Sequence, residues 1–292
     1  MVTTRRAAAE RARAAAMAFS TLSGDEQGII LGQLRNALEP RLVVYFSSAS
    51  KELRALLPPA ARRQLRADYK KATALCCKAS MRSCKELREA RSVQWIDRGL
   101  SAADLTTLGT LSSVLPALQV LSLYEFSADT AGPEGVQRLA ERLGVGALPA
   151  VRILAVGYTH VGDAGALALA AALGRGALPR LQTLHLVNAA IGGAGLVALA
   201  PALRRRPTLA HLDLSGNSLG DEGITALVAP PPPAGALPPP AGGLKRLKTL
   251  DLRNTHVTDA GCATITSAID SGALPALKVL RLDGIAASAA AN

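Results

Sequence analysis

Apolar residues recur along this 292-residue chain in a fixed order that returns six times. The clearest copy runs from Leu209 to Leu219, with apolar residues at positions 1, 4, 6 and 11 and polar or small residues between them. Burial of the alternate side chains at positions 4 and 6 predicts a short β-strand in each copy. The copies lie 28 to 38 residues apart, which predicts stacked supersecondary units, and they begin at Leu118, Val151, Leu181, Leu209, Leu247 and Leu277.

A helix is predicted after each strand. Asp163 and Asp221 each stand two residues before a glycine where such a helix begins, and each carboxylate is expected to cap the helix that it begins. A Gly-Ala-Leu-Pro sequence, as at 176–179 and 272–275, is expected to end the helix because proline cannot continue it. Two of these segments have apolar stripes at helical spacing, namely Leu167, Leu169, Ala170 and Leu173, and then Leu196, Leu199, Ala200 and Leu203.

The repeated phrase resembles the leucine-rich repeats, in particular the ribonuclease-inhibitor-like class in which every strand is paired with a helix. The resemblance implies an α/β fold, a leucine-rich repeat solenoid of about seven strand-helix repeats with a parallel sheet on the concave face and helices on the convex face. A degenerate first copy begins at Ala90. The asparagine that the family places at position 9 is present only as Asn217, so we expect less regular turns elsewhere.

Composition and charge divide the chain. We expect a basic leader at 1–18, a small all-α unit at 19–89 and the repeats at 90–292, with a proline-rich loop inserted at 229–243. Residues 1–90 hold 17 Lys/Arg and 8 Asp/Glu, and residues 91–292 hold 16 and 14. Because the array is close to neutral, we expect no nucleic-acid partner along it. The last copy lacks a full helix, so this end is expected to fray, to bind a partner or to continue in a longer product.

Several features limit the class of protein. The four cysteines, Cys76, Cys77, Cys84 and Cys262, have neither disulfide-framework nor zinc-finger spacing, and no cofactor is expected. No apolar run approaches the ~20 residues of a membrane span, and no secretory signal opens the chain. We therefore expect an intracellular protein, cytoplasmic or nuclear. The arginine- and alanine-rich leader leaves an organelle transit sequence open.

Residues 19–54 have apolar positions at mainly helical spacing, interrupted at Glu39-Pro40. Their order is similar to that of an F-box, and the matching residues are Leu22, Ile29, Ile30, Leu34, Leu42 and Phe46. This resemblance implies that the unit binds the adaptor of a cullin ubiquitin ligase while the repeats hold the substrate. The alternative is a generic binding scaffold in which the unit only caps the apolar end of the first repeat.

One short motif invites an enzymatic interpretation. Residues 216–220, Gly-Asn-Ser-Leu-Gly, match a nucleophile elbow between a strand and a helix, but Asn217 and Leu219 are already repeat positions 9 and 11. Asp251 and His256 are the only downstream pair in the order that a hydrolase needs. We therefore predict a non-enzymatic protein. The Ran GTPase-activating proteins contain the same repeat class, which leaves a small-GTPase regulator as a remote alternative by fold analogy alone.

The concave face is where a protein partner is expected. Positions 5 and 7 alternate with the buried positions and point outward, over a sheet of seven rungs ~29 Å long. His185, His211, Asp213 and Asp251 are expected to form one polar cluster, which we interpret as a recognition patch and not a metal site because ligands on separate rungs are loosely placed. Tyrosines are the expected anchors. The predicted partner-binding residues are Tyr124, Tyr158, His185, His211, Asp213, Asp251, Arg253, Arg281 and Asp283.

Overall fold

The computed structural model describes residues 59–126, 131–228 and 243–287, together with residues 14, 17–19, 21–23, 36–39, 41 and 44. The chain divides into two compact units, residues 1–86 and 87–292. The short helices predicted between residues 19 and 54 lie largely outside the described residues, and so does the predicted loop at 229–243, apart from Gly243.

Helix α5 (Pro59–Lys78) is the longest helix among the described residues, and the short helix α6 (Cys84–Glu89) follows it. Proline suits the first position of a helix because its missing N–H would have no partner there. The buried residues of α5 share one stripe, and the Sγ atom of Cys76 lies 3.9 Å from that of Cys84. The four cysteines are free thiols.

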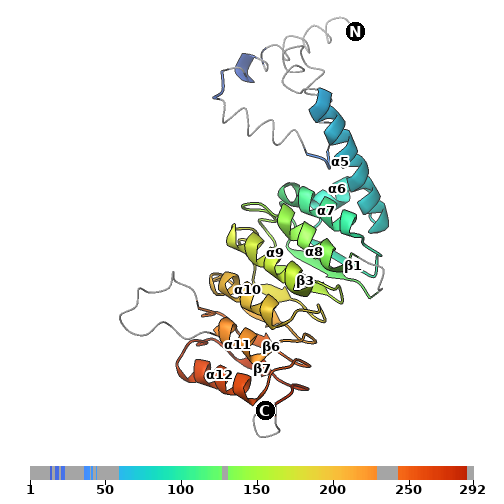
Figure 1. Cartoon of the computed structure of the whole chain (residues 1–292). Coiled ribbons are helices and arrows are strands. Elements are labelled where there is room, and N and C mark those ends of the chain that lie inside the picture. The colour runs from blue at the N-terminus through green and yellow to red at the C-terminus, as the bar shows by residue number, and fades with distance from the viewer. Residues whose placement is uncertain are drawn as a thin grey trace, which may run out of the picture. The chain divides into compact units, whose positions relative to one another are not determined.

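Residues 87–292 form the repeat unit, in which seven strands make one parallel sheet in the order β1 to β7 (Figure 1). The predicted number and order of strands are therefore confirmed. The strands are β1 (Ser92–Ile96), β2 (Val120–Tyr124), β3 (Ile153–Gly157), β4 (Thr183–His185), β5 (His211–Asp213), β6 (Thr249–Asp251) and β7 (Val279–Arg281).

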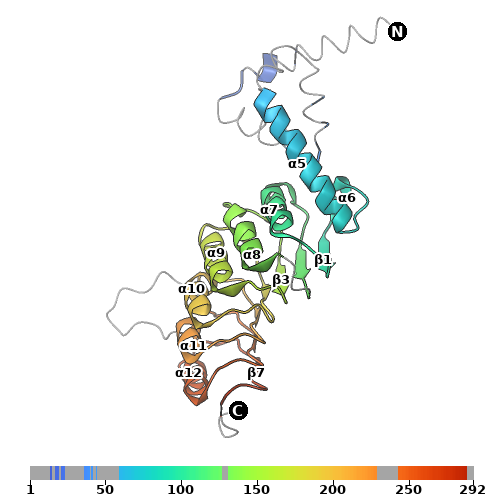
Figure 2. The ribbon, with the colours of Figure 1, turned by 45° about the vertical axis from the view of Figure 1, so that its right-hand side comes forward.

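Helices cover one face of this sheet and leave the other face open, as Figure 2 shows. Each helix packs on the next one along the array. The helices are α7 (Ala102–Leu111), α8 (Gly132–Arg142), α9 (Gly162–Gly174), α10 (Gly193–Arg204), α11 (Asp221–Val228) and α12 (Asp259–Asp270), with a 3₁₀ turn η1 (Ser112–Val114) after α7.

The repeated leucines form the core of the array. Strand pairing places position 4 of each copy beside position 4 of the next, as in Leu184, Leu212 and Leu250. In β1 the buried residues are Val93 and Trp95, so the degenerate first copy is a true rung of the sheet. In β1 and β2 the period of two thus separates a core face from an open face, as the sequence predicts, whereas in β3 all four residues after Ile153 are buried.

The helical stripes are confirmed with one exception. Leu196, Leu199, Ala200 and Leu203 of α10 are all fully buried. In α9, however, Leu167 is 60% exposed. Ala166 takes its place in the buried stripe because 166, 169, 170 and 173 follow the i, i+3, i+4, i+7 spacing of one helix face, whereas residue 167 lies about 100° around the helix.

The aspartate caps join neighbouring repeats, which corrects the prediction that each caps its own helix. The Oδ1 atom of Asp163, in α9, accepts hydrogen bonds from the N–H groups of Gly192 (2.7 Å) and Gly195 (3.0 Å) at the start of α10. Asp221, in α11, accepts from Thr258 at the start of α12 in the same way. Stacked helices begin side by side, so a carboxylate in the first turn of one helix reaches the unpaired donors of the next.

Arginines make the corresponding links at the helix ends. The Arg175 guanidinium donates to the carbonyl oxygens of Ala140 and Leu143, just where α8 ends. Arg206 donates to the carbonyl oxygen of Leu173 in the last turn of α9 and to that of Ala177 just after this helix. Cations at helix C-termini satisfy unpaired carbonyls and complement the helix dipole, so each repeat is fastened to the one before it.

Two buried side chains fix the turns that follow the strands. The Oδ1 atom of Asn217 accepts hydrogen bonds from the N–H groups of Ala189 (3.1 Å) and Ile191 (3.0 Å) on the preceding rung, and its Nδ2 donates to three carbonyls. On the second rung Glu125 fixes the turn in the same way, because its carboxylate accepts hydrogen bonds from the N–H groups of residues 98 to 100 on the preceding rung. An acid one position earlier in the repeat thus replaces the family's asparagine.

Candidate functional site

Three exposed side chains and the half-buried Tyr124 gather where the first three strands end, and we call this group the aromatic patch: Ile96, Tyr124, Phe126 and Tyr158. Ile96 is 50% exposed, Phe126 57% and Tyr158 42%. The rings of Phe126 and Tyr158 have centroids 4.6 Å apart, and those of Tyr124 and Tyr158 are 6.4 Å apart. Strand pairing sets Ile96 beside Tyr124. The four side chains therefore form one continuous surface across three rungs.

The backbone around this patch is adapted to hold the rings. A Cβ atom on Gly157 would lie 2.6 Å from Cε1 of Tyr124, so only glycine leaves room for that ring. Burial raises the pKa of the Tyr124 hydroxyl, and the charge of Asp213 raises it further. Tyr124 is therefore a neutral hydrogen-bonding group at physiological pH.

Tyr158 adopts a left-handed backbone conformation, with φ of 56°. The equivalent position is also left-handed on five of the six other rungs, the exception being Glu125, but there it holds residues that tolerate this region better, namely Asp97, Asn188, Gly216, Asn254 and Gly284. A large aromatic residue at this turn costs backbone strain of ~1–2 kcal/mol. The fold alone would favour asparagine or glycine at residue 158.

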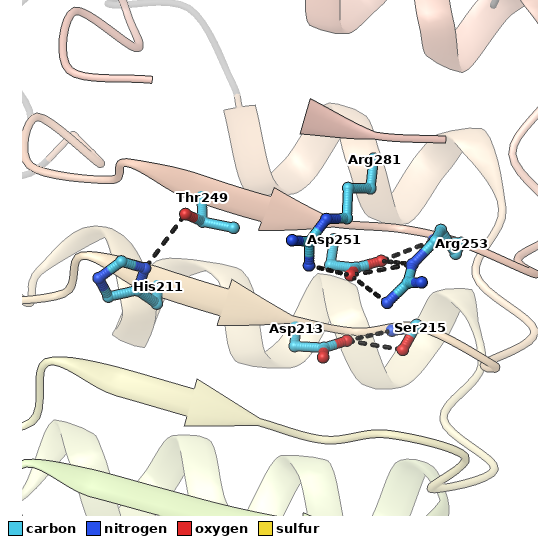
Figure 3. A network of polar contacts seen from close by, with 7 residues as sticks. All are labelled: His211, Asp213, Ser215, Thr249, Asp251, Arg253 and Arg281. Carbon is cyan, nitrogen blue, oxygen red and sulfur yellow. Dashed lines mark hydrogen bonds and ion pairs between the residues drawn. The ribbon is translucent and has the colours of Figure 1, made fainter. Parts of the chain in front are cut away.

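A second group of side chains lies on the last three strands, and we call it the Asp-Arg cluster: Asp213, Asp251, Arg253 and Arg281 (Figure 3). Arg253 holds both carboxylate oxygens of Asp251 through Nε and Nη2, at 2.8 to 3.1 Å. Arg281 reaches the same carboxylate at 3.1 Å. Asp251 is only 1% exposed beneath the two guanidinium groups, so it positions them and does not itself face solvent.

Charge and burial act in opposite directions on Asp251. Burial alone would raise the pKa of its carboxyl, but hydrogen bonds from the side chain and backbone of Arg253 and from Arg281 outweigh burial and lower it. Asp213 instead accepts hydrogen bonds from the backbone N–H and the hydroxyl of Ser215. The cluster is thus a fixed arrangement of two partly exposed arginines with an acid beside them.

The predicted polar cluster is only partly assembled. Strand register sets His185, Asp213 and Asp251 in one row across β4, β5 and β6. His211 belongs to another row, nearer the start of β5, where its Nδ1 lies 3.1 Å from Oγ1 of Thr249 (Figure 3). Among the residues that the structure describes, no group of three or more His, Cys, Asp or Glu side chains is arranged to hold a metal ion.

Other predicted site residues have simpler surroundings. Asp283 is exposed just after β7. In the F-box-like segment, Leu22 is half-buried, and the other five lie outside the described residues, namely Ile29, Ile30, Leu34, Leu42 and Phe46.

The proposed nucleophile elbow has a structural explanation. Asn217 is buried in the turn contacts described above, and Asp251 is held by two arginines. Ser218 is exposed on the turn between these elements. The residues that make the motif resemble an elbow are therefore the ones that the repeat itself requires.

Sequence reasoning missed Ile96 and Phe126 as members of the site. Phe126 stands at position 9, where the family has asparagine, and a large aromatic residue at a turn position was the available signal. This signal becomes informative only when the contact of Phe126 with Tyr158 is known.

Within the described parts of the chain, no helix is both long and apolar enough to cross a membrane.

Comparison with known proteins agrees with the repeat geometry. A family model described as Leucine Rich repeat matches residues 149–170, 178–200, 206–228 and 245–265. No curated protein matches the sequence.

Solved structures with similar folds share little sequence with this chain. The chain is similar to the TLR13 chain of the TLR13-ssRNA13 complex, with 19% identity and a TM-score of 0.31, covering 69% of this chain and 30% of that one. It is also similar to an internalin (inlF) from Listeria monocytogenes, with 10% identity and a TM-score of 0.25, covering 74% of this chain and 89% of that one. The chain thus spans less than a third of the TLR13 chain. The matched repeats and the seven-stranded parallel sheet together identify the second unit as a leucine-rich repeat solenoid.

Proposed function

We propose that this chain is a non-enzymatic binding protein that holds a protein partner on the open face of its sheet. The observation that carries the proposal is the aromatic patch, in which Ile96, Phe126 and Tyr158 are half-exposed and touch or adjoin across three rungs. Tyrosine and other aromatic residues are enriched where protein interfaces are most tightly packed. A continuous exposed apolar surface of this kind is typical of an interaction site.

The strained backbone of Tyr158 supports the same proposal. Strain at a functional site persists when the side chain serves a purpose that the fold does not need. The rung has a tyrosine where all four rungs that follow it have asparagine or glycine, and Gly157 clears the space for Tyr124 beside it. These departures from the repeat occur together, on one surface.

The Asp-Arg cluster supplies a polar contact region at the other end of the face. Arg253 and Arg281 are held by Asp251 with their outer N–H groups partly exposed. Arginines that are fixed before binding lose little side-chain entropy when they meet a carboxylate. We propose that the aromatic patch anchors the partner and that this cluster selects among partners by charge.

At the finer level we propose that the chain is an F-box-type substrate receptor of a cullin ubiquitin ligase, acting in the cytoplasm or nucleus. Its support is the order of apolar residues in 19–54, which resembles an F-box. It is also supported by a helix after each of β1 to β6, as in the ribonuclease-inhibitor-like repeats that the sequence resembles. In this arrangement residues 19–54 would bind the adaptor and the open sheet face would bind the substrate.

The adaptor contact is tested with purified proteins. Wild-type full-length chain is expected to retain the cullin ligase adaptor in a pull-down, and a Leu42→Ala/Phe46→Ala double variant is expected to lose it. Val44→Ala is the matched control, because Val44 is 61% exposed within the same segment. If the wild type retains no adaptor, the N-terminal unit is a cap and the generic scaffold is the correct function.

The substrate surface is tested by affinity capture. Proteins enriched on the wild type are expected to be lost from a Phe126→Ser/Tyr158→Asn variant. A Val145→Ser/Leu167→Ser variant is the control, since it removes two exposed apolar side chains outside the patch. Identical partners on all three proteins would show that the aromatic patch is not the binding surface.

A further inference from the structure

Charge in the repeat unit is segregated between the two edges of the sheet. Because all seven strands are parallel, every helix-to-strand loop lies at the edge where strands begin, and every strand-to-helix loop lies at the edge where they end. The first edge is basic. Its loops, residues 90–91, 115–119, 143–152, 175–182, 205–210, 243–248 and 271–278, contain ten Lys/Arg and no Asp or Glu.

The opposite edge is acidic. Acids stand there in the strand-to-helix loops and in the first turns of the helices, including Asp97, Glu125, Asp163, Asp221, Glu222, Asp259 and Asp283. Most of them sit near helix N-termini, where the helix dipole favours negative charge. The near-neutral sum over residues 91–292 therefore averages two edges of opposite sign.

Nine of the ten basic-edge cations are exposed, and we call the eight of them that cap no helix the basic ridge: Arg91, Arg152, Arg180, Arg205, Lys245, Arg246, Lys248 and Lys278. Several follow one continuous line of backbone hydrogen bonds, in which the N–H of Lys278 donates to the carbonyl of Lys248 and the N–H of Gln119 to that of Arg91. Strands lie ~4.8 Å apart, so seven rungs extend the ridge over ~29 Å.

Among the described residues, the side-chain contacts that join neighbouring repeats involve none of these eight side chains. The other two cations of the loops, Arg175 and Arg206, cap the carbonyls of neighbouring helices. None of the ridge side chains, by contrast, forms an ion pair with a described residue. A row of like charges in this arrangement repels itself and is relieved by a bound polyanion.

The character of the ridge distinguishes between polyanions. A protein interface needs a packed apolar or aromatic centre. At this edge the exposed large apolar side chains are Val145 and Val279. They lie four rungs apart, so they do not form the apolar centre that a protein partner needs. Single-stranded nucleic acid needs aromatic platforms for its bases, and the loops of this edge contain no Phe, Tyr or Trp. A duplex requires only phosphate contacts, which arginine and lysine supply.

We propose that the basic ridge binds the phosphate backbone of a nucleic-acid duplex, without reading its sequence. The ~29 Å ridge matches about eight base pairs at ~3.4 Å each. Arginine forks fit phosphate oxygens in pairs, and lysines act as point charges between them. This surface lies at the edge of the sheet where the strands begin, whereas the aromatic patch lies where they end, so the proposal is independent of a protein partner.

The test measures binding of the full-length chain to fluorescent 20-base-pair duplexes, one of RNA and one of DNA, by anisotropy across a salt series. The ridge variant is Arg246→Gln/Lys248→Gln. The control is Arg98→Gln/Arg138→Gln, which removes the same charge from the strand-to-helix edge and from the middle of α8. Circular dichroism melting checks that both variants stay folded.

Both duplexes are expected to bind the wild type, with the lower Kd showing whether RNA or DNA is the better fit. The ridge variant is expected to raise Kd roughly tenfold at ~0.1 M salt and to reduce the slope of log Kd against log salt by about 2, one for each lost phosphate contact. The control is expected to change neither.

Three results would overturn the proposal. The first is no duplex binding at this salt concentration, and the second is an equal loss of affinity in the control. The third is displacement of the duplex by polyglutamate at equal charge concentration, which would assign the ridge to an acidic protein segment instead.

Discussion

Asn217 offers a quantitative test of how the repeats are fastened. Replacing it with alanine removes the acceptor of two backbone N–H groups, those of Ala189 and Ile191, in residues that are fully buried. Each donor left without a partner costs ~1–3 kcal/mol. The Asn217→Ala variant should therefore lose about 2–6 kcal/mol of unfolding free energy, and its Tm should fall by roughly 4–24 °C at ~2–4 °C per kcal/mol.

Urea unfolding followed by circular dichroism measures this loss, and hydrogen exchange locates it. Exchange protection should fall most at the amides of Ala189 and Ile191, since opening of a repeat array is governed by contacts between neighbouring repeats. Ser218→Ala is the matched control, because the side chain of this neighbour is exposed and its pairing with Gly192 uses only the backbone, so this variant should leave stability unchanged. An Asn217→Ala protein within about 0.5 kcal/mol of the wild type would refute the reasoning.

Three further predictions concern other parts of the molecule. Gly261→Ala would place a Cβ atom 2.4 Å from Oδ1 of Asp221. It should displace this carboxylate from Thr258 at the start of α12 and lower the free energy of unfolding in urea by about 1–3 kcal/mol. An unchanged urea midpoint would contradict a stabilising role of the Asp221 cap. The pKa of Asp251 is lower in the folded protein than in the unfolded chain, so the ionised carboxylate stabilises the fold at pH values above the unfolded pKa of ~3.9. This stabilisation is lost as pH falls through the folded pKa. The free energy of unfolding should therefore fall less steeply with decreasing pH in Asp251→Asn than in the wild type, as acid titrations followed by circular dichroism would show. Burial raises the pKa of Cys76 to about 12, so iodoacetamide at pH ~8 should modify the exposed Cys77 before Cys76. Mass spectrometry of digests measures the two modification rates, and equal rates for Cys76 and Cys77 would be inconsistent with a buried Cys76 thiol.

The spacing of leucines was enough to predict the strands and most of the helices. Position 4 of each copy pairs with position 4 of the next because a period of two leaves one register that buries every leucine. The same reasoning misplaced Leu167, whose neighbour Ala166 has the better helical phase. Alanine and leucine were hard to rank because both suit a helix and both suit a core.

The contacts between repeats were beyond the reach of spacing. Asp163 caps the next helix and not its own, because stacking brings the two helix starts together. Glu125 replaces an asparagine that the pattern places one residue later. The Asp163 and Glu125 contacts both depend on how close neighbouring rungs lie to each other, and the sequence pattern of a single repeat gives no information on that distance.

The candidate site was predicted in outline only. Tyr124 and Tyr158 stood out by residue type, but the partnership with Phe126 required the turn geometry. Asp251 was expected on the open face and is there, yet two arginines bury it. Net charge hid the basic ridge, because a sum over residues discards which edge of the sheet each loop occupies.

The unfolding free energy of Tyr158→Asn tests whether the aromatic patch exists for a partner or for the fold. Asparagine relieves a left-handed strain of ~1–2 kcal/mol, and the two exposed ring contacts that are lost contribute ~0.5–1.5 kcal/mol each. If Tyr158 serves a binding surface, the variant should lie between about 1 kcal/mol more stable and about 2 kcal/mol less stable than the wild type. A loss of clearly more than about 2 kcal/mol would show that the ring stabilises the solenoid itself and would contradict the proposed binding surface.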